Sequence, residues 1–132
     1  MINIWYPVKP KPAPRPRVTR RGTYNDKDYT DWKKGLGLIA KNKIKKHLEN
    51  ELFVKIEFFY EIPKSWSKKK KELAKWHKSK PDIDNLIKSV LDGLNGIAYK
   101  DDAQVVMIQA RKQYATFNGV KIEIEEIKQW KI

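Results

Sequence analysis

The spacing of hydrophobic and polar residues predicts four strands. Over residues 52–62 every second residue is apolar, which is the period of a strand with one buried face. Ile2–Tyr6 alternates in the same way over a shorter length, and further strands are expected at residues 104–114 and 120–127. A turn at Asn118-Gly119 suits a hairpin between these last two strands.

The same analysis predicts two amphipathic helices and a possible third. Over residues 83–94 the apolar positions fall at i, i+3, i+4, i+7, i+8 and i+11, so one helical face is fully apolar. Pro81 favours an extended approach, Asp84 suits the N-cap, and Asn95-Gly96 offers a left-handed exit. Residues 28–48 carry apolar residues every three to five positions, which also suits a helix. Residues 65–78 suit either a short helix that keeps Trp66, Leu73 and Trp76 partly packed or a mobile loop.

These elements predict an α+β fold with a mixed or antiparallel sheet of about four strands packed by two to three helices. The length of 132 residues fits one domain over residues 1–132. No apolar run is long enough to span a membrane, and no secretory signal is recognisable, so a cytoplasmic protein without membrane contact is expected.

The charge of the chain points to a polyanionic partner. The formal net charge is +13, and so large an excess usually reflects binding to nucleic acid. Residues 63–80 are rich in lysine, with Lys68, Lys69, Lys70 and Lys71 in one run beside tryptophans. Residues 7–22 form a proline-rich basic segment whose alternate prolines favour an extended conformation. That segment is either a DNA-contacting loop or a plain surface connector.

The polar residues around the helix at residues 83–94 are candidates for metal chemistry. Cysteine is absent and only two histidines occur, so any metal is expected to be a hard ion held by oxygen. Lys88 follows Asp84 by four residues, so their side chains project from one helical face. The helix rises roughly 15 Å from Asp84 to its end, and residues 95–101 can span roughly 23 Å, so Asp102 can return to the helix start. Three converging carboxylates would repel one another unless a cation were bound, and Mg²⁺ matches such ligands.

Spacing alone leaves a structural alternative open. Asp84 can be only an N-cap, Asp82 a turn residue, Asp101-Asp102 an ordinary loop, and Lys88 half of a surface ion pair.

Three segments make the sequence resemble the RusA family of Holliday-junction resolvases. They are Lys80-Pro81-Asp82-Ile83-Asp84-Asn85-Leu86-Ile87-Lys88, Leu91-Asp92-Gly93-Leu94-Asn95-Gly96 and Lys100-Asp101-Asp102-Ala103-Gln104-Val105. Arg15-Pro16-Arg17 and Arg20-Arg21-Gly22-Thr23-Tyr24 resemble the family's N-terminal pattern more loosely.

The resemblance implies a homodimeric, Mg²⁺-dependent endonuclease that makes paired symmetrical cuts across a four-way DNA junction, with Mn²⁺ as a substitute ion and no small-molecule cofactor. It implies that Asp82, Asp84 and Asp102 hold the metal and that Lys88 is the essential lysine. Supporting roles fall on Asp92, Asp101 and Asn85. The expected DNA-binding residues are Arg15, Arg17, Arg20, Arg21, Lys68, Lys69, Lys70, Lys71 and Lys80. A less selective nuclease for branched or flap DNA and a non-catalytic nucleic-acid-binding protein are the competing functions.

Overall fold

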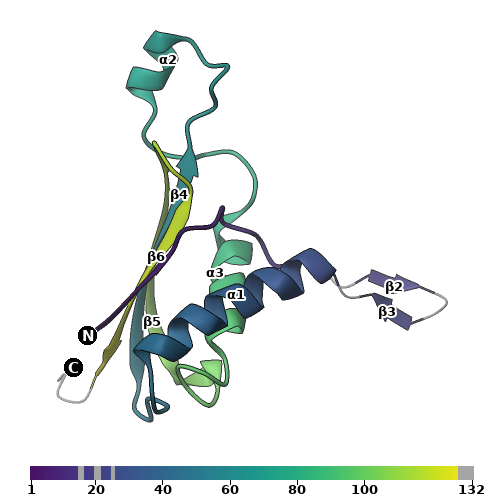
Figure 1. Ribbon diagram of the computed structural model, residues 1–132, viewed down its shortest axis with the longest axis vertical. Coiled ribbons are helices and arrows are strands. Elements are labelled where there is room, and N and C mark those ends of the chain that lie inside the picture. The colour runs from purple at the N-terminus through teal and green to yellow at the C-terminus, as the bar shows by residue number, and fades with distance from the viewer. Residues whose placement is uncertain (15–16, 20–21, 25, 128–132) are drawn as a thin grey trace.

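Four strands form a mixed sheet in the order β1-β6-β4-β5 (Figure 1). They are β1 (Ile2–Tyr6), β4 (Leu52–Glu61), β5 (Val105–Ala115) and β6 (Gly119–Glu126). β5 runs parallel to β4, whereas β6 is antiparallel to both β4 and β1. The computed structural model describes residues 1–14, 17–19, 22–24 and 26–127, with only the backbone described at 17–19 and 22–24. The expected α+β class with a mixed four-stranded sheet is confirmed.

The central strand β4 shows why the sheet has one buried face. Its residues alternate between buried and partly exposed along the whole strand, because successive side chains point to opposite faces of a sheet. Val54, Ile56 and Phe58 on the inner face are fully buried. Both edges of β4 are hydrogen-bonded to neighbouring strands, so this strand anchors the core.

The predicted hairpin between the last two strands is wrong, because β4 lies between β5 and β6. A connection of three residues is long enough to pass the end of β4, since neighbouring strands lie only about 5 Å apart. This connection is fixed to β4: the Glu61 amide donates a 2.9 Å hydrogen bond to Asn118 Oδ1, and the Ile62 amide donates a 3.0 Å bond to the Ala115 carbonyl. Asn118 therefore serves a crossing loop rather than a tight hairpin turn.

Helices α1 (Lys27–Lys43) and α3 (Ile83–Leu94) cover one face of the sheet and leave the other face open (Figure 1). The two helices approach closely at Gly93, where an added Cβ would lie 2.9 Å from Leu36 Cδ2. The predicted left-handed exit from α3 is confirmed at Gly96, whose φ is +80°.

The first helix ends five residues earlier than the sequence pattern predicts. Ile44 is extended yet buried, and the Leu48 amide donates a 2.9 Å hydrogen bond to the Ala98 carbonyl. The apolar residues of this segment therefore pack across the loop that follows α3. Their spacing alone resembled a continued helix.

Two smaller elements extend from this core. The short helix α2 (Lys68–Leu73) lies on an arm beyond the end of β4 (Figure 1). β2 (Arg17–Thr19) pairs with β3 (Gly22–Tyr24) in a separate two-stranded ribbon. β2 falls within residues 7–22, which were expected to be a loop, and β3 begins at the last residue of that segment. Within the described ranges, no helix is long and apolar enough to cross a membrane.

The proline-rich segment before the ribbon is partly packed against the domain. The Ala13 amide donates a 3.0 Å hydrogen bond to the Asn85 carbonyl, and the Trp32 indole donates a 3.0 Å bond to the Lys9 carbonyl. Ala13 itself is buried. The segment is therefore tied to both α1 and α3.

Candidate active site

The start of α3 carries two of the predicted metal ligands. Asp82 occupies the N-cap position without a capping side-chain hydrogen bond, and Asp84 lies in the first turn. The prediction that Asp84 is the N-cap is therefore wrong by two residues. Asp84 Oδ1 accepts a 2.9 Å hydrogen bond from the Asn85 amide, and Asp82 Oδ1 accepts a 2.8 Å bond from Lys80 Nζ. Two carboxylates at this helix end also suit the positive end of the helix dipole.

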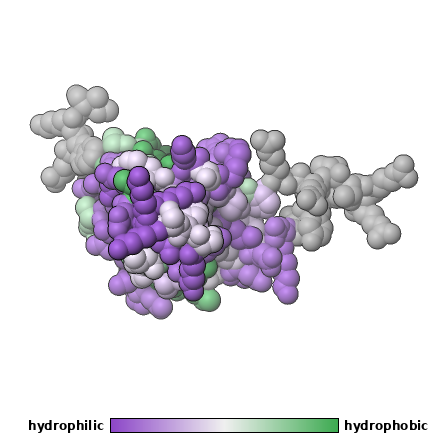
Figure 2. All heavy atoms as spheres, turned by 90° about the horizontal axis from the view of Figure 1, so that it is seen from above, coloured by the Kyte–Doolittle hydropathy of each residue, from purple (hydrophilic) through white to green (hydrophobic). Residues whose placement is uncertain are grey.

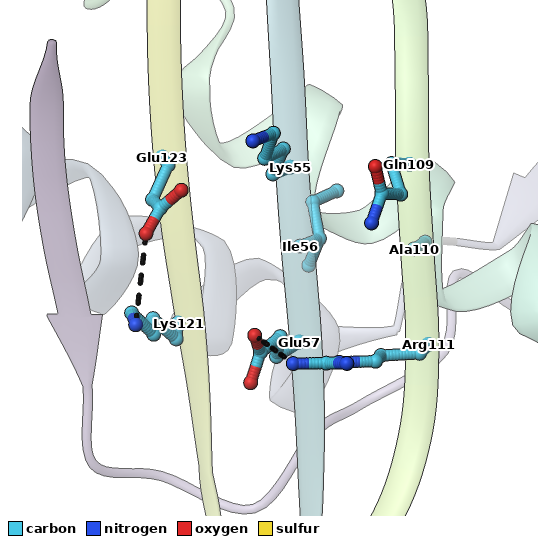
Figure 3. Close-up of a pocket in the computed structure, with 8 residues that line it drawn as sticks. All are labelled: Lys55, Ile56, Glu57, Gln109, Ala110, Arg111, Lys121 and Glu123. Carbon is cyan, nitrogen blue, oxygen red and sulfur yellow. Dashed lines mark hydrogen bonds and ion pairs between the residues drawn. The ribbon is translucent and has the colours of Figure 1, made fainter.

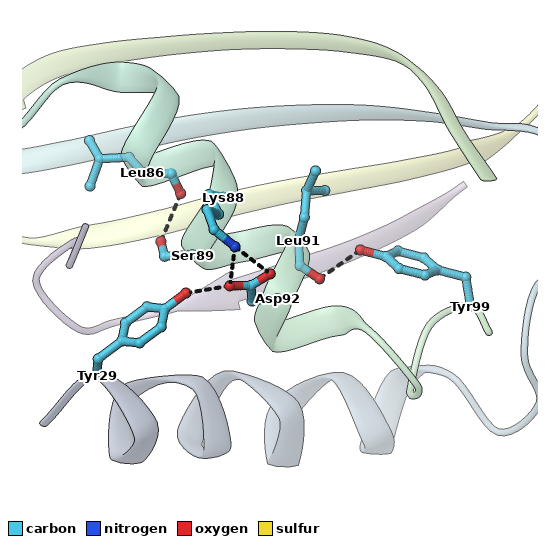
Figure 4. A network of polar contacts seen from close by, with 7 residues as sticks. All are labelled: Tyr29, Leu86, Lys88, Ser89, Leu91, Asp92 and Tyr99. Atoms are coloured by element: carbon cyan, nitrogen blue, oxygen red, sulfur yellow. Dashed lines mark hydrogen bonds and ion pairs between the residues drawn. The ribbon is translucent and has the colours of Figure 1, made fainter. Parts of the chain in front are cut away.

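The middle of α3 presents Lys88 and Asp92 within a network that extends to α1 (Figure 4). Lys88 Nζ lies 3.0 Å from Asp92 Oδ2, and the Tyr29 hydroxyl donates a 2.7 Å hydrogen bond to the same oxygen. Burial and the adjacent Asp92 carboxylate raise the pKa of Tyr29, so the hydroxyl stays protonated. Tyr29 therefore holds the carboxylate that orients Lys88.

Beyond α3, a short 3₁₀ turn η1 (Asp102–Gln104) places two more carboxylates. Asp101 caps this turn, and the hydrogen bond from the Ala103 amide lowers the pKa of Asp101. A hydrogen bond shared with Asp101 raises the pKa of Asp102, with slight burial and the negative charges of Asp101 and Asp92 adding to the effect and Lys88 opposing it. Asp102 thus lies within electrostatic reach of Asp92 and Lys88.

The charges of the same acids also act on buried Tyr99. Its hydroxyl donates a 2.8 Å hydrogen bond to the Leu91 carbonyl (Figure 4). Burial and the nearby charges of Asp102, Asp92 and Asp101 raise the pKa of Tyr99. Tyr99 therefore connects the end of α3 to the segment that carries Asp102.

The structure brings part of the predicted constellation together. Asp84, Lys88 and Asp92 lie at i, i+4 and i+8 on one face of α3, and the charges of Lys88 and Asp92 act on the pKa of Asp102. Asp82 instead interacts with Lys80 and Lys112 at the helix start. Within residues 1–14 and 26–127 and the two ribbon strands, no group of three acidic or histidine side chains is close enough to hold a metal ion. The three-carboxylate metal site remains a prediction.

An open groove of about 880 Å³ runs beside the start of α3. Asp82, Ile83 and Asp84 form one side, and Trp76, Arg111 and Lys112 contribute to the remainder. Lys112 Nζ donates hydrogen bonds of 2.7 Å and 2.6 Å to the carbonyls of Ser79 and Pro81. Burial lowers the pKa of Lys112, and Lys80 adds to this effect, whereas Asp82 opposes it. Lys112 therefore fixes the backbone that leads into the acidic helix start.

Of the basic residues expected to bind DNA, those whose side chains the structure describes lie on α2 and at the groove. Lys68, Lys69, Lys70 and Lys71 are exposed on α2, with Lys70 Nζ 4.0 Å from the centre of the Trp66 ring. Lys80 is exposed at the groove and pairs with Asp82. Arg15, Arg20 and Arg21 lie outside the described residues, and for Arg17 only the backbone is described. In the view from above, most of the visible described surface is hydrophilic (Figure 2).

Two residues of the site were missed from the sequence. Tyr29 resembled an ordinary residue of the first helix, because nothing in its spacing revealed a contact with Asp92. Lys112 carried a usable signal: its register places it opposite Phe58, on the inner face of β5. A lysine at an inward position is unusual unless its ammonium group finds partners.

Comparison with known proteins assigns the chain to a family. The model of the family described as Endodeoxyribonuclease RusA matches residues 7–125, and the chain belongs to this family. The chain is 37% identical over 92 residues to a protein of Lactococcus phage r1t named Crossover junction endodeoxyribonuclease rusA, covering 67% of this chain and 66% of that protein. It is 38% identical over 78 residues to the Bacillus subtilis (strain 168) protein YqaN, described as uncharacterized, covering 54% of this chain and 55% of that protein.

The match therefore spans slightly less than two thirds of the phage protein and about half of YqaN. The predicted family resemblance is confirmed.

Proposed function

We propose that the protein is a Mg²⁺-dependent, structure-specific DNA endonuclease that resolves four-way junctions by paired symmetrical cuts. The observation that carries the proposal is the face of α3 on which Lys88 lies between Asp84 and Asp92, with Asp102 in electrostatic reach. Membership of the RusA family and the printed name of the phage relative support this reaction and substrate. The net charge of +13 supports a DNA substrate.

In this proposal Asp82, Asp84 and Asp102 hold Mg²⁺, and Mn²⁺ can substitute. The donor set fits, because the three carboxylates are exposed and Mg²⁺ prefers carboxylate oxygens together with water and phosphate oxygens. When bound, such an ion polarises a phosphate and activates water for hydrolysis. Because the three carboxylates do not form one group in this structure, the proposal includes their convergence when metal and DNA bind.

Lys88 supplies a positive side chain next to the phosphate, in addition to the charge of the metal ion. Its ammonium group has three N–H donors, so it can keep the 3.0 Å contact with Asp92 and bind a phosphate oxygen with another donor. Charge that develops on the phosphate is stabilised by a donor that is already oriented. Asp92 and Asp101 support the site by holding Lys88 and Asp102, and Asn85 joins α3 to the proline-rich segment through its carbonyl.

The lysines of α2, together with Lys80 and the arginines of residues 15–21, are proposed to bind the phosphates of the junction arms. Contacts of this kind position DNA without reading its sequence. A DNA substrate of this type also implies a cytoplasmic, nucleoid-associated enzyme.

We further propose that the protein acts as a homodimer through the open face of the sheet. In contrast to the strongly basic chain, the centre of this face carries a nearly balanced set of charges (Figure 3). Arg111 pairs with Glu57 at 2.6 Å, and Lys121 lies 3.6 Å from Glu123. A surface with both signs can pair with itself across a two-fold axis, whereas it has little attraction for DNA phosphates.

Exposed apolar residues near both ends of this face favour the same partner. Trp5 and Phe117 are 43% and 44% exposed, and their rings contact each other at 5.6 Å. Met107, opposite Phe53 on the neighbouring strand, is 42% exposed. Trp5→Glu is expected to shift the mass measured by analytical ultracentrifugation toward that of the monomer. Leu38→Glu, at an exposed position of α1, is the matched control. A wild-type monomer at micromolar concentration would contradict the dimer.

The decisive experiment is cleavage of a labelled immobile four-way junction with and without Mg²⁺. We expect a symmetrical pair of nicks that requires the metal. Asp82→Asn, Asp84→Asn and Asp102→Asn should each abolish cutting while junction binding persists, and Asp31→Asn on the exposed side of α1 is the matched control.

Two outcomes favour the competing functions. Equal rates on flap DNA, linear duplex and the junction at matched salt would indicate a less selective nuclease, since basic surfaces bind every DNA form at low salt. Binding that is unchanged by chelation, without any nicking, would indicate a nucleic-acid-binding protein.

A further inference from the structure

Trp76 is a large aromatic side chain that remains 53% exposed beside the predicted catalytic carboxylates. It lines the groove that also contains Asp82 and Asp84. Lysines surround it, and Lys75 Nζ lies 5.1 Å from the centre of its ring. Trp76 is therefore about half exposed, and Leu73, which is 74% exposed, is packed less than the helical alternative for this segment predicted.

The backbone around Trp76 is fixed to the edge of the sheet. Trp76 forms a bridge with Gln113 of β5. On either side, the Tyr114 amide donates a 2.8 Å hydrogen bond to the Lys75 carbonyl, and the His77 amide donates a 3.2 Å bond to the Lys112 carbonyl. Trp76 thus projects from a short strand-like segment held in register with β5.

The next side chain strengthens this attachment. The His77 ring stacks on Tyr60, with 4.0 Å between ring centres, and lies 5.0 Å from Tyr114. The aromatic packing of this segment is therefore provided by His77. Trp76 contributes little to the core, so packing does not explain why a tryptophan occupies this position.

Trp66 provides an internal comparison. Its ring packs edge-on against Tyr114 at 5.1 Å, and Lys70 lies over it at 4.0 Å. Trp66 is partly buried within the arm. Of these two tryptophans in the lysine-rich segment, only Trp76 lines the groove beside the carboxylates.

We propose that Trp76 stacks on a base that is not covered by a stacked neighbour at the DNA branch point and thereby positions the adjoining phosphate near the carboxylates. This inference rests on the proposed function and names the feature of the substrate that the site recognises. Every base has a π face, so an aromatic ring can bind unstacked bases without a sequence requirement. In continuous duplex the bases are stacked on one another, so the ring gains no such contact. Trp76 therefore favours branched or single-stranded DNA over duplex.

Equilibrium binding tests this role without any cleavage. Affinities are measured in chelator for an immobile four-way junction, a single-stranded oligonucleotide and a continuous duplex. Trp76→Leu keeps an apolar side chain but removes the ring, and we expect about tenfold weaker binding to the junction and the single strand with duplex binding changed less than about twofold. Trp76→Phe should retain most of the affinity. Leu73→Ala, an exposed apolar truncation in the same arm, is the matched control and should leave all three affinities unchanged.

A fluorescent base reports the stacking directly. With 2-aminopurine at the branch point or within the single strand, wild type and Trp76→Phe should quench its emission, and Trp76→Leu should not. Equal loss of affinity for all three DNA forms, or unchanged binding and quenching in Trp76→Leu, would overturn the proposal. Because the single strand is assayed without metal, this result is independent of whether the protein cuts junctions.

Discussion

The hydroxyl of Tyr29 on α1 donates a 2.7 Å hydrogen bond to Asp92 Oδ2 on α3, and the same oxygen lies 3.0 Å from Lys88 Nζ. Tyr29 is buried, whereas the Lys88 side chain is 62% exposed. An exposed lysine would otherwise sample many rotamers. These two contacts therefore restrict the Lys88 side chain to an orientation that is set by the packing of α1 against α3.

Removing this hydroxyl should slow cleavage without weakening DNA binding. In Tyr29→Phe the Asp92 carboxylate loses a donor, and hydrogen bonds to charged groups contribute about 1.5–3 kcal/mol. If about half of this energy serves to orient Lys88, kcat for junction cleavage should fall about four- to tenfold, with KM nearly unchanged. Single-turnover kinetics on a labelled junction measure both quantities.

Tyr6→Phe is the matched control, because the Tyr6 hydroxyl also donates a buried 2.8 Å hydrogen bond to α1, at the Trp32 carbonyl, away from Lys88. Both variants should lose similar stability, and only Tyr29→Phe should lose kcat. Equal kcat values in the two variants would show that Tyr29 is merely structural.

The periodic segments were predictable because burial alone determines their pattern. The inner face of β4 and the apolar stripe of α3 each contact one continuous core, so the spacing of their residues reveals the element and the buried side. The acidic and basic residues of α3 lie away from that stripe for the same reason. The helical face that carries Asp84, Lys88 and Asp92 could therefore be read from the sequence.

The remaining features depend on contacts between distant segments. The sequences of β5 and β6 indicate two strands but not that β4 lies between them, since sheet order depends on which edges pair. The spacing around Ile44 and Leu48 indicates burial but not the helix end. The contact between Tyr29 and Asp92 joins residues 63 positions apart. None of these relationships leaves a periodic signal in the sequence.

Magnesium should stabilise the folded protein if the three proposed ligands hold it. A ligand that binds only the native state at 100 times its Kd stabilises that state by about 2.7 kcal/mol, which raises the Tm of a domain of this size by several degrees. Thermal melts with Mg²⁺ and with chelator measure the shift.

Asp82→Asn, Asp84→Asn and Asp102→Asn should each reduce the shift, and Asp31→Asn should retain it. A full shift in all three variants would place the ion elsewhere, whatever the effect of these substitutions on cleavage.

Gly119 is required by the Trp5 ring on the open face of the sheet. A Cβ added at residue 119 would lie 2.1 Å from Trp5 Cη2, and this ring is itself packed against Phe59 and Phe117. Gly119→Ala should therefore destabilise the fold by about 1–3 kcal/mol through overpacking, as measured by urea denaturation. Adding Trp5→Leu should recover most of this loss.

Gly96→Ala separates the steric effect from backbone strain. Gly96 has a φ of +80° and no atom within 4 Å of an added Cβ, so its substitution should cost about 1 kcal/mol through conformation alone. Trp5→Leu should give no recovery in that background. Recovery in both backgrounds would mean that Trp5→Leu stabilises the fold for an unrelated reason.

His77 should make the stability of the fold sensitive to mild acid. Burial between Tyr60 and Tyr114 lowers the pKa of His77 below its usual value, and the positive charges of Lys112 and Lys9 add to this effect. The unfolded chain therefore binds this proton more readily than the folded chain. The stabilisation is present above about pH 6.5 and is lost as the pH falls below that value.

Tm should decrease between about pH 7.5 and pH 5.5 by more in wild type than in His77→Phe, which keeps an aromatic ring but cannot be protonated. Parallel decreases in the two proteins would assign the acid sensitivity to carboxylates, and a steeper decrease in His77→Phe would reverse the predicted sign.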